Sequence, residues 1–356
     1  MVSGNIFYAS DKAVFDALTQ KKITNEQLSE LFFTRGTLIS KKTSRDNLSK
    51  YFSRNIHDYY DHQFIAKVFG STARREKTIA TRIKNNIENN DIEEIVSSLC
   101  STRSDNDEKL DFVTKDNGFD ISIKYKEVDY NKTEFKQVSD KEAVISLIKE
   151  GDEWFIRSPL NDFVEGVKEH LLDNISEEMK NESTELVTED IELNIVDDLS
   201  LRKKFFDKEL ISSIGSYSLY DVTQVYVYNP DDESDPDRYI SKASLNGNGV
   251  LESSELSSLY GKGFYIWKII WKIRENNMSD IYEIEAQFAN AKDCDKFSYL
   301  VRGFYKYKDG EYNSSKTQLS DADELRITQL IDKAAKSTMD KIKKEWLKSN
   351  EQVNEA

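Results

Sequence analysis

Apolar residues in the first hundred positions recur at the three- and four-residue spacing of amphipathic helices. Thr24 and Gln27 form a capping-box pattern, and Gly36 stands where the helix that follows should end. The run 37–42 is too short and too basic for a core strand, so it is predicted to be an extended connector. Short helices are predicted where this spacing brings apolar residues to one face: Val14, Ala17 and Leu18; Leu28, Leu31 and Phe32; Leu48, Tyr51 and Phe52; Ile92, Ile95, Val96 and Leu99.

After Leu110 the period changes from helical to alternating, which is typical of strands. Turn signals at Asn117-Gly118 and Glu150-Gly151 predict two hairpins. The long runs 263–275, 280–288 and 297–308 predict an antiparallel meander, and a helix over 321–348 would cover one face of it. The fold class is therefore predicted to be α+β: an all-α N-terminal helical domain followed by a mixed antiparallel β-sheet region with covering helices.

A chain of 356 residues is longer than one core normally fills. We predict a helical, basic domain over residues 1–100 and a polar linker over 101–109. A small α+β domain is expected over 110–180, and an acidic α+β domain with a C-terminal helix over 181–356.

The charge is distributed unevenly between these parts. The whole chain carries 50 basic and 65 acidic residues, a formal net charge of −15. Residues 35–84 contain 12 basic and 4 acidic residues, a net of +8, and residues 1–90 carry +6, which leaves −21 for the remainder. A local positive field on an acidic protein indicates a phosphate-binding surface on one domain.

Residues 24–54, which include the run TNEQLSELFFTRGTLISKKTSRDNLSKYF, resemble the helix–extended–helix modules of the SAP and HeH type. Those modules have a leucine-bearing helix that ends in Arg-Gly, a Ser/Lys-rich arm and a second helix with a leucine. The residues that match are Leu28, Leu31, Arg35, Gly36, Ser40, Lys41, Lys42 and Leu48. The resemblance covers about a tenth of the chain and implies contacts to the DNA backbone, not a catalytic site.

The next stretch, residues 62–83, is similar to a helix-turn-helix, with Gly70 at the turn. It departs from that pattern because Glu76 falls where the second helix should be apolar, and the competing interpretation is an ordinary helical hairpin. From the two stretches together we predict that basic side chains grip DNA: Arg35, Lys41, Lys42, Arg45, Lys50, Arg54, Arg74, Arg75, Lys77 and Arg82.

Candidate chemistry is sparse. Glu283 and Glu285 alternate along one predicted strand, as the acids of PD-(D/E)xK nucleases do, but Gln287 replaces the lysine of that pattern. Cross-strand pairs between these glutamates and the lysines of 268–274 on a solvated sheet face explain the same residues. His57, Asp58, Asp61 and His62 could place two metal ligands on a helix face, against which we weigh ordinary surface pairs. No cofactor motif is present, and neither a cofactor nor a metal is predicted.

The function predicted from these observations is a DNA-binding, non-catalytic subunit of a multi-protein bacterial DNA-transaction or anti-phage defence complex. The basic N-terminal domain would grip the DNA backbone, and the acidic C-terminal region would dock a partner or a second copy. A Mg²⁺-dependent nuclease using Glu283 and Glu285 and a protein–protein scaffold stay open as alternatives. Two distant cysteines and the absence of a membrane-length apolar run or a signal peptide predict a cytoplasmic protein.

Overall fold

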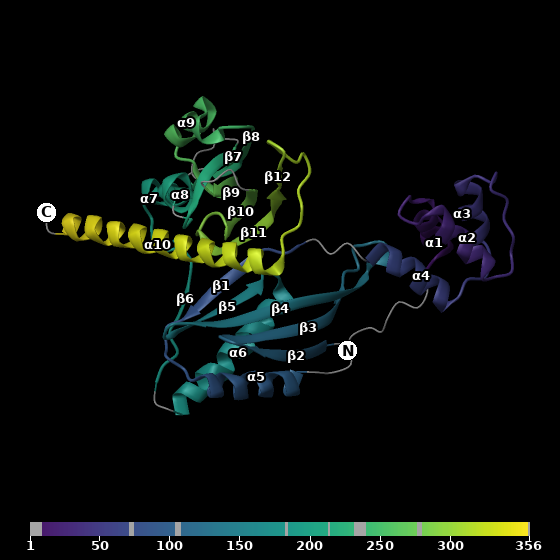
Figure 1. The fold of residues 1–356 in the computed structure, drawn as a ribbon, viewed down its shortest axis with the longest axis horizontal. Helices are drawn as coiled ribbons and strands as arrows, with labels where there is room; N and C mark the ends of the chain where they lie inside the picture. Colours follow the sequence, from purple (N-terminus) through teal and green to yellow (C-terminus); the bar gives the residue numbers. More distant parts are fainter. Residues whose placement is uncertain are drawn as a thin grey trace. The chain divides into compact units, whose positions relative to one another are not determined.

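The structure is a computed structural model that describes residues 9–70, 75–103, 108–181, 184–212, 214–230, 240–275 and 280–354. It confirms the α+β class, with N-terminal helices followed by a large antiparallel sheet and a C-terminal helix (Figure 1). The chain divides into two compact units. Unit 1 contains residues 1–75, 96–113 and 121–144, and unit 2 contains residues 76–95, 114–120 and 145–356.

Unit 1 begins with four helices whose starts follow from local capping. Ser10 accepts a hydrogen bond from the Ala13 amide, and Thr24 and Gln27 form the predicted reciprocal capping box. Gly36 follows the second helix with φ +67°, a backbone conformation that glycine adopts without strain. The helices are α1 (Asp11–Thr19), α2 (Asn25–Phe33), α3 (Arg45–Ser53) and α4 (Tyr59–Gly70).

The helices of unit 1 share a small apolar core, to which α1 and α2 contribute the stripes predicted for them. Val14, Leu18, Leu28 and Phe52 are each at most 1% exposed in it. The prediction is wrong for Tyr51 of α3, which is 59% exposed, whereas its neighbour Phe52 is buried. Phe135, from the short 3₁₀ turn Glu134–Lys136, joins the same core. The Glu134 carboxylate also accepts hydrogen bonds from the backbone amide and hydroxyl of Ser10, which secures the start of α1.

The helix-turn-helix prediction fails at its second helix. Residues 78–83 form strand β1 (Thr78–Ile83), with the burial pattern of a strand inside a sheet. Its neighbours come from distant parts of the chain, since Ile79 pairs with Ser158 on one side and Ser298 on the other. The alternation of Ile79, Thr81 and Ile83 is the period-2 signal that favours this strand over a helix.

Unit 2 is built around a sheet in which the neighbours β4-β5-β1-β11-β10-β9-β7-β8 all pair antiparallel. β2 and β3 precede β4 in the sheet order, and β6 pairs with β1. The predicted hairpins and the meander are confirmed. The strands are β2 (Glu108–Lys115), β3 (Gly118–Val128), β4 (Val138–Glu150), β5 (Glu153–Pro159), β6 (Thr188–Asp190), β7 (Tyr217–Tyr228), β8 (Lys242–Asn246), β9 (Tyr265–Glu275), β10 (Ile281–Asn290) and β11 (Asp295–Tyr305), with a separate pair of short strands, β12 (Tyr307–Lys308) and β13 (Glu311–Tyr312).

One face of this sheet carries the main core. Trp271 and Ile273 from β9 meet Phe205 and Phe206 of a π-helical segment and Met339 of the C-terminal helix, all at 0% exposure. The predicted C-terminal helix is confirmed as α10 (Asp321–Asn354) (Figure 1). The remaining helices are α5 (Asn89–Arg103), α6 (Asp162–Asn181), α7 (Leu199–Lys204), α8 (Leu210–Ser212) and α9 (Ser254–Gly261).

The units do not follow the predicted domain boundaries. The limits of unit 1 fall inside α5, β2, β3 and β4, so neither unit is a continuous segment of the chain. The expected linker 101–109 includes the end of α5 and the start of β2, and its residues 104–107 lie outside the described ones. Within the described residues, no helix is both long and apolar enough to cross a membrane.

Candidate nucleic-acid interface

The connector between α2 and α3 presents two of the predicted cations to solvent. Lys41 and Lys42 are exposed, and neither makes an ion pair within the residues that the structure describes. The connector ends in a turn in which the Thr43 amide donates to the Ser40 carbonyl. Ser44 caps α3 by accepting a hydrogen bond from the Asn47 amide.

Helix α3 adds two more exposed cations. Lys50 and Arg54 are four residues apart, which places them on one side of the helix. Tyr51 lies beside them with 59% of its surface exposed, and its ring stacks on Phe32 at a centroid distance of 6.2 Å. Phe52, the next residue, is fully buried, so the apolar stripe holds α3 in place and turns this side outward. We call Lys41, Lys42, Lys50, Tyr51 and Arg54 the arm–α3 surface.

Large apolar side chains also reach solvent around this surface. Phe33, Leu38 and Ile56 are 70%, 87% and 91% exposed. Leu38 lies in the connector itself, Phe33 ends α2, and Ile56 follows α3. The sequence analysis did not single them out, although an apolar residue in a connector too short to form a core strand is the signal that could have done so.

Arg35 is a structural residue. Its guanidinium pairs with the Asp61 carboxylate, donates to the Ile56 carbonyl and lies 5.0 Å from the Phe52 ring centroid. Those contacts tie α2 to the start of α4 and leave the side chain 25% exposed.

Arg45 is likewise engaged inside unit 1. Nη1 donates to the carbonyls of Leu18 and Gln20 at 2.9 Å, and Nη2 donates to the Ile23 carbonyl at 2.7 Å and to Asn25 Oδ1 at 2.8 Å. These acceptors belong to the end of α1 and its connection to α2, where helical carbonyls lack partners. Arg45 therefore closes that connection.

The cations predicted from the helix-turn-helix resemblance do not form one set with the arm. Arg74 lies outside the described residues, and Arg75 is exposed at the end of unit 1. Lys77 and Arg82 belong to unit 2, where Lys77 pairs with Glu285 at 3.0 Å and Arg82 pairs with Glu153 and Glu189.

The carboxylates of the His57–His62 cluster organise the first turn of α4. The Asp58 amide donates to the Asp61 carboxylate and the Asp61 amide donates to the Asp58 carboxylate, both at 3.0 Å. The hydrogen bond from the Asp61 amide holds the pKa of Asp58 below its ordinary value. Nδ1 of His57 lies 2.7 Å from Nε2 of His62. No group of three or more potential metal ligands occurs among the described side chains.

Glu283 and Glu285 lie on the sheet face opposite the main core, as their alternation predicts. Glu285 forms ion pairs with Lys268 at 2.7 Å and with Lys77 at 3.0 Å, and Glu283 accepts a hydrogen bond from Lys316 at 2.6 Å. The prediction of cross-strand pairing is confirmed for Lys268, but the face is not solvated there, because the two carboxylate side chains are only 7–8% exposed. Burial by itself would raise the pKa of Glu285, but the two lysines outweigh it and lower that pKa below its ordinary value.

No protein-family model and no curated protein sequence matches this chain.

Proposed function

We propose that this chain binds DNA through the arm–α3 surface and serves as the non-catalytic, DNA-holding subunit of a larger bacterial DNA-transaction or anti-phage defence complex. The observation that carries the proposal is the exposure of Lys41, Lys42, Lys50 and Arg54, which have no ion-pair partner in the described part of the chain. Exposed cations keep their hydration and lose nothing by lying near a polyanion, whereas a phosphate contact releases condensed counterions.

The shape of the surface supports backbone contacts. The nine residues of α3 extend over roughly 13 Å, at 1.5 Å per residue, and the two connector lysines precede its N-terminus. Tyr51 follows Lys50 in α3 and is 59% exposed, so a base of a single strand could stack on its ring. Phosphate contacts of this kind position a protein on nucleic acid without selecting a sequence.

The charge of the rest of the chain supports a role within an assembly. The residues after position 90 carry a net charge of −21, which repels DNA and leaves the N-terminal surface as the favourable side. An acidic region can dock a basic partner through complementary fields. The carboxylates of Glu283 and Glu285 are held by lysines, which favours holding DNA over cleaving it.

The test is a titration of the full chain against labelled duplex and single-stranded DNA, repeated at several salt concentrations. In the quadruple variant Lys41→Ala/Lys42→Ala/Lys50→Ala/Arg54→Ala, we expect the affinity to fall by at least tenfold. The slope of log K against log salt should become shallower by about 1 for each phosphate contact removed. The matched control is Lys12→Ala/Lys21→Ala, which removes exposed cations of the same unit from outside the surface.

Other outcomes distinguish the alternatives. Tyr51→Ala should weaken single-stranded binding more than duplex binding if the ring stacks on bases. Equal affinities of the quadruple variant and the control would refute the proposal. Metal-dependent cleavage that Glu285→Ala abolishes with binding intact would support the nuclease instead, and salt-sensitive self-association without a DNA complex would support the scaffold.

A further inference from the structure

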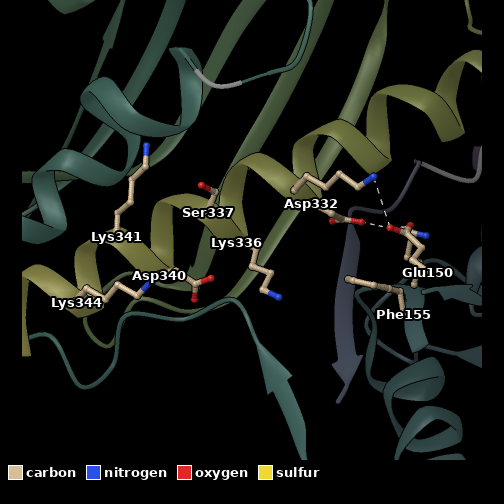
Figure 2. Close-up of a pocket in the computed structure, with 10 residues that line it drawn as sticks. Glu150, Phe155, Asp332, Lys336, Ser337, Asp340, Lys341 and Lys344 are labelled. Atoms are coloured by element: carbon tan, nitrogen blue, oxygen red, sulfur yellow. Dashed lines mark hydrogen bonds and ion pairs between the residues drawn. The ribbon is translucent and has the colours of Figure 1, made fainter. Parts of the chain in front are cut away.

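Helix α10 and strand β5 enclose a pocket of about 370 Å³ in unit 2, far in sequence from the arm–α3 surface. Its lining includes five cationic side chains and three carboxylates, on a chain whose net charge is −15. Figure 2 shows the labelled residues of α10 along one wall, with Glu150 and Phe155 across from them. A concave site of this size is in the range that holds small molecules.

The strand side of the pocket contains a buried arginine with spare hydrogen-bonding capacity. Arg157 is 5% exposed; its Nε donates to Asp332 at 2.6 Å and its Nη2 donates to Glu150 at 3.2 Å. Its Nη1 is buried and has no hydrogen-bond partner among the described residues. Because Arg157 lines the pocket and keeps its positive charge, a phosphate oxygen that reached its guanidinium would form a charge-assisted hydrogen bond.

The helix side contributes lysines at helical spacing. Lys333 lies 3.7 Å from Glu150, and Lys341 pairs with Glu209 outside the pocket. Lys336 and Lys344 make no ion pair within the described ranges, and Lys336 is only partly exposed. Figure 2 shows Lys336 projecting from α10 on a different side from Lys341. Lys336 is therefore a partly desolvated cation for which the described residues supply no ion-pair partner.

The other lining groups indicate what kind of anion fits. Ser337 adds a hydroxyl from α10, and Phe155 adds an aromatic ring whose centroid lies 5.5 Å from the Arg157 guanidinium. Arginine forks and lysine ammonium groups together are a usual environment for phosphate oxygens, and the ring offers an apolar surface to the rest of a ligand. The cations come from two elements, since four lysines belong to α10 and Arg157 belongs to β5, so a phosphate between the two elements could meet both kinds of cation.

We propose that this pocket binds a phosphorylated small molecule of nucleotide size, with its phosphate held by Arg157 and Lys336. The site is separate from the arm–α3 surface, so this proposal stands or falls independently of DNA binding. Lys344 would lie at the mouth of the pocket and add to the attraction of the anion.

The test is calorimetric titration of the full chain with ATP, ADP, pyrophosphate and inorganic phosphate, each in the presence of a chelator. We expect the nucleotides to bind more tightly than inorganic phosphate, and we expect Lys336→Ala to weaken nucleotide binding by about tenfold or more. Lys336→Arg should restore most of the affinity. The matched control is Lys348→Ala, an exposed lysine of α10 that does not line the pocket.

A second variant keeps the test independent of folding. Arg157→Lys retains the positive charge but loses the planar fork, so it should weaken binding while tryptophan fluorescence confirms a native unit 2. The proposal is overturned if none of the four probes binds at millimolar concentration, or if Lys336→Ala binds nucleotides as the wild type does. It is also overturned if a DNA duplex is the ligand that Lys336→Ala loses, because the site would then read a polymer backbone.

Discussion

The arm–α3 surface of unit 1 and the charged sheet face of unit 2 contain the same residue types in opposite circumstances. In unit 2, Lys77 and Lys268 are 20% and 16% exposed and share the Glu285 carboxylate. In unit 1, Lys42 and Lys50 are exposed and have no partner in the chain as described. A cation that is removed from water needs a carboxylate close by, whereas an exposed one does not.

This difference divides the basic residues near the N-terminus into two classes. Arg35, Arg45, Lys77 and Arg82 stabilise the fold through carboxylates or carbonyls that lie up to 208 positions away in sequence. The cations of the arm–α3 surface make no ion pair in the described part of the chain, so they can bind an external polyanion without a cost to the fold. The net charge of a sequence window such as residues 35–84 counts both classes together, so it overstates the number of cations that are available to bind a polyanion.

The largest effect on stability is expected at the buried pair of unit 2. Asp332 is 4% exposed, and Asp332→Ala would leave the Arg157 guanidinium buried with only Glu150 to balance it. We expect the free energy of unfolding to fall by about 3–5 kcal/mol. Urea titration followed by tryptophan fluorescence measures it, because Trp154 and Trp271 are fully buried in unit 2.

The matched control for that variant is Asp340→Ala, two turns further along α10, where the carboxylate is partly exposed and has no ion pair within the residues described. It should change the unfolding free energy by less than about 1 kcal/mol. If the two variants lost the same free energy of unfolding, the buried Arg157–Asp332 pair would stabilise the fold no more than an exposed carboxylate does. The contrast between buried, paired cations and exposed ones would then be wrong.

A smaller effect on stability is expected at Arg45 in unit 1. It tests whether the cations that stabilise the fold differ from the exposed cations of the arm–α3 surface. Arg45→Ala removes four hydrogen bonds at the connection between α1 and α2, and we expect a loss of about 2 kcal/mol. Hydrogen exchange of residues 11–33 is the suitable measurement, because all four tryptophans lie in unit 2. Lys42→Ala should leave the exchange rates of these residues unchanged. If Arg45→Ala and Lys42→Ala gave the same exchange rates, Arg45 would not be a structural cation and the division into two classes would be wrong.

Local signals predicted much of the fold. The capping box at Thr24, the turns at Asn117-Gly118 and Glu150-Gly151 and the helix over 321–348 depend on residues a few positions apart, and each appears as expected. What the sequence could not supply was the pairing of β1 between β5 and β11, or the division of β4 between two units. The pairing of β1 depends on contacts between residues separated by 71 to 221 positions, which leave no trace in a local window.

The candidate sites illustrate the same limit on local reasoning. The exposure of Lys41 and Lys42 was predictable, because a short basic connector has nothing to pack against. The structural role of Arg45 was not, since its acceptors are backbone carbonyls that any residue provides. The Arg157 site was missed, although an arginine directly after the apolar run Trp154-Phe155-Ile156 is a sequence signal for a buried charge.

The smallest expected effect concerns Glu285 and the pH dependence of unit 2. Its folded pKa lies below the ordinary value of 4.5, so its stabilising contribution is present above that pH and is lost as the pH falls through the lower, folded value. Glu285→Gln should therefore be less stable than the wild type by about 1–2 kcal/mol at pH 6, and the difference should shrink as the pH falls below 4.5 and through the lower, folded pKa. The loss of stability is smaller than at Asp332 because Lys77 and Lys268, unlike Arg157, remain partly exposed and can recover hydration.

The control is Glu26→Gln, at an exposed position of α2, which should show no such pH-dependent difference from the wild type. A difference between Glu285→Gln and the wild type that stays constant from pH 6 to pH 3 would mean that the side chain acts through its shape, and the electrostatic account of this sheet face would then be wrong.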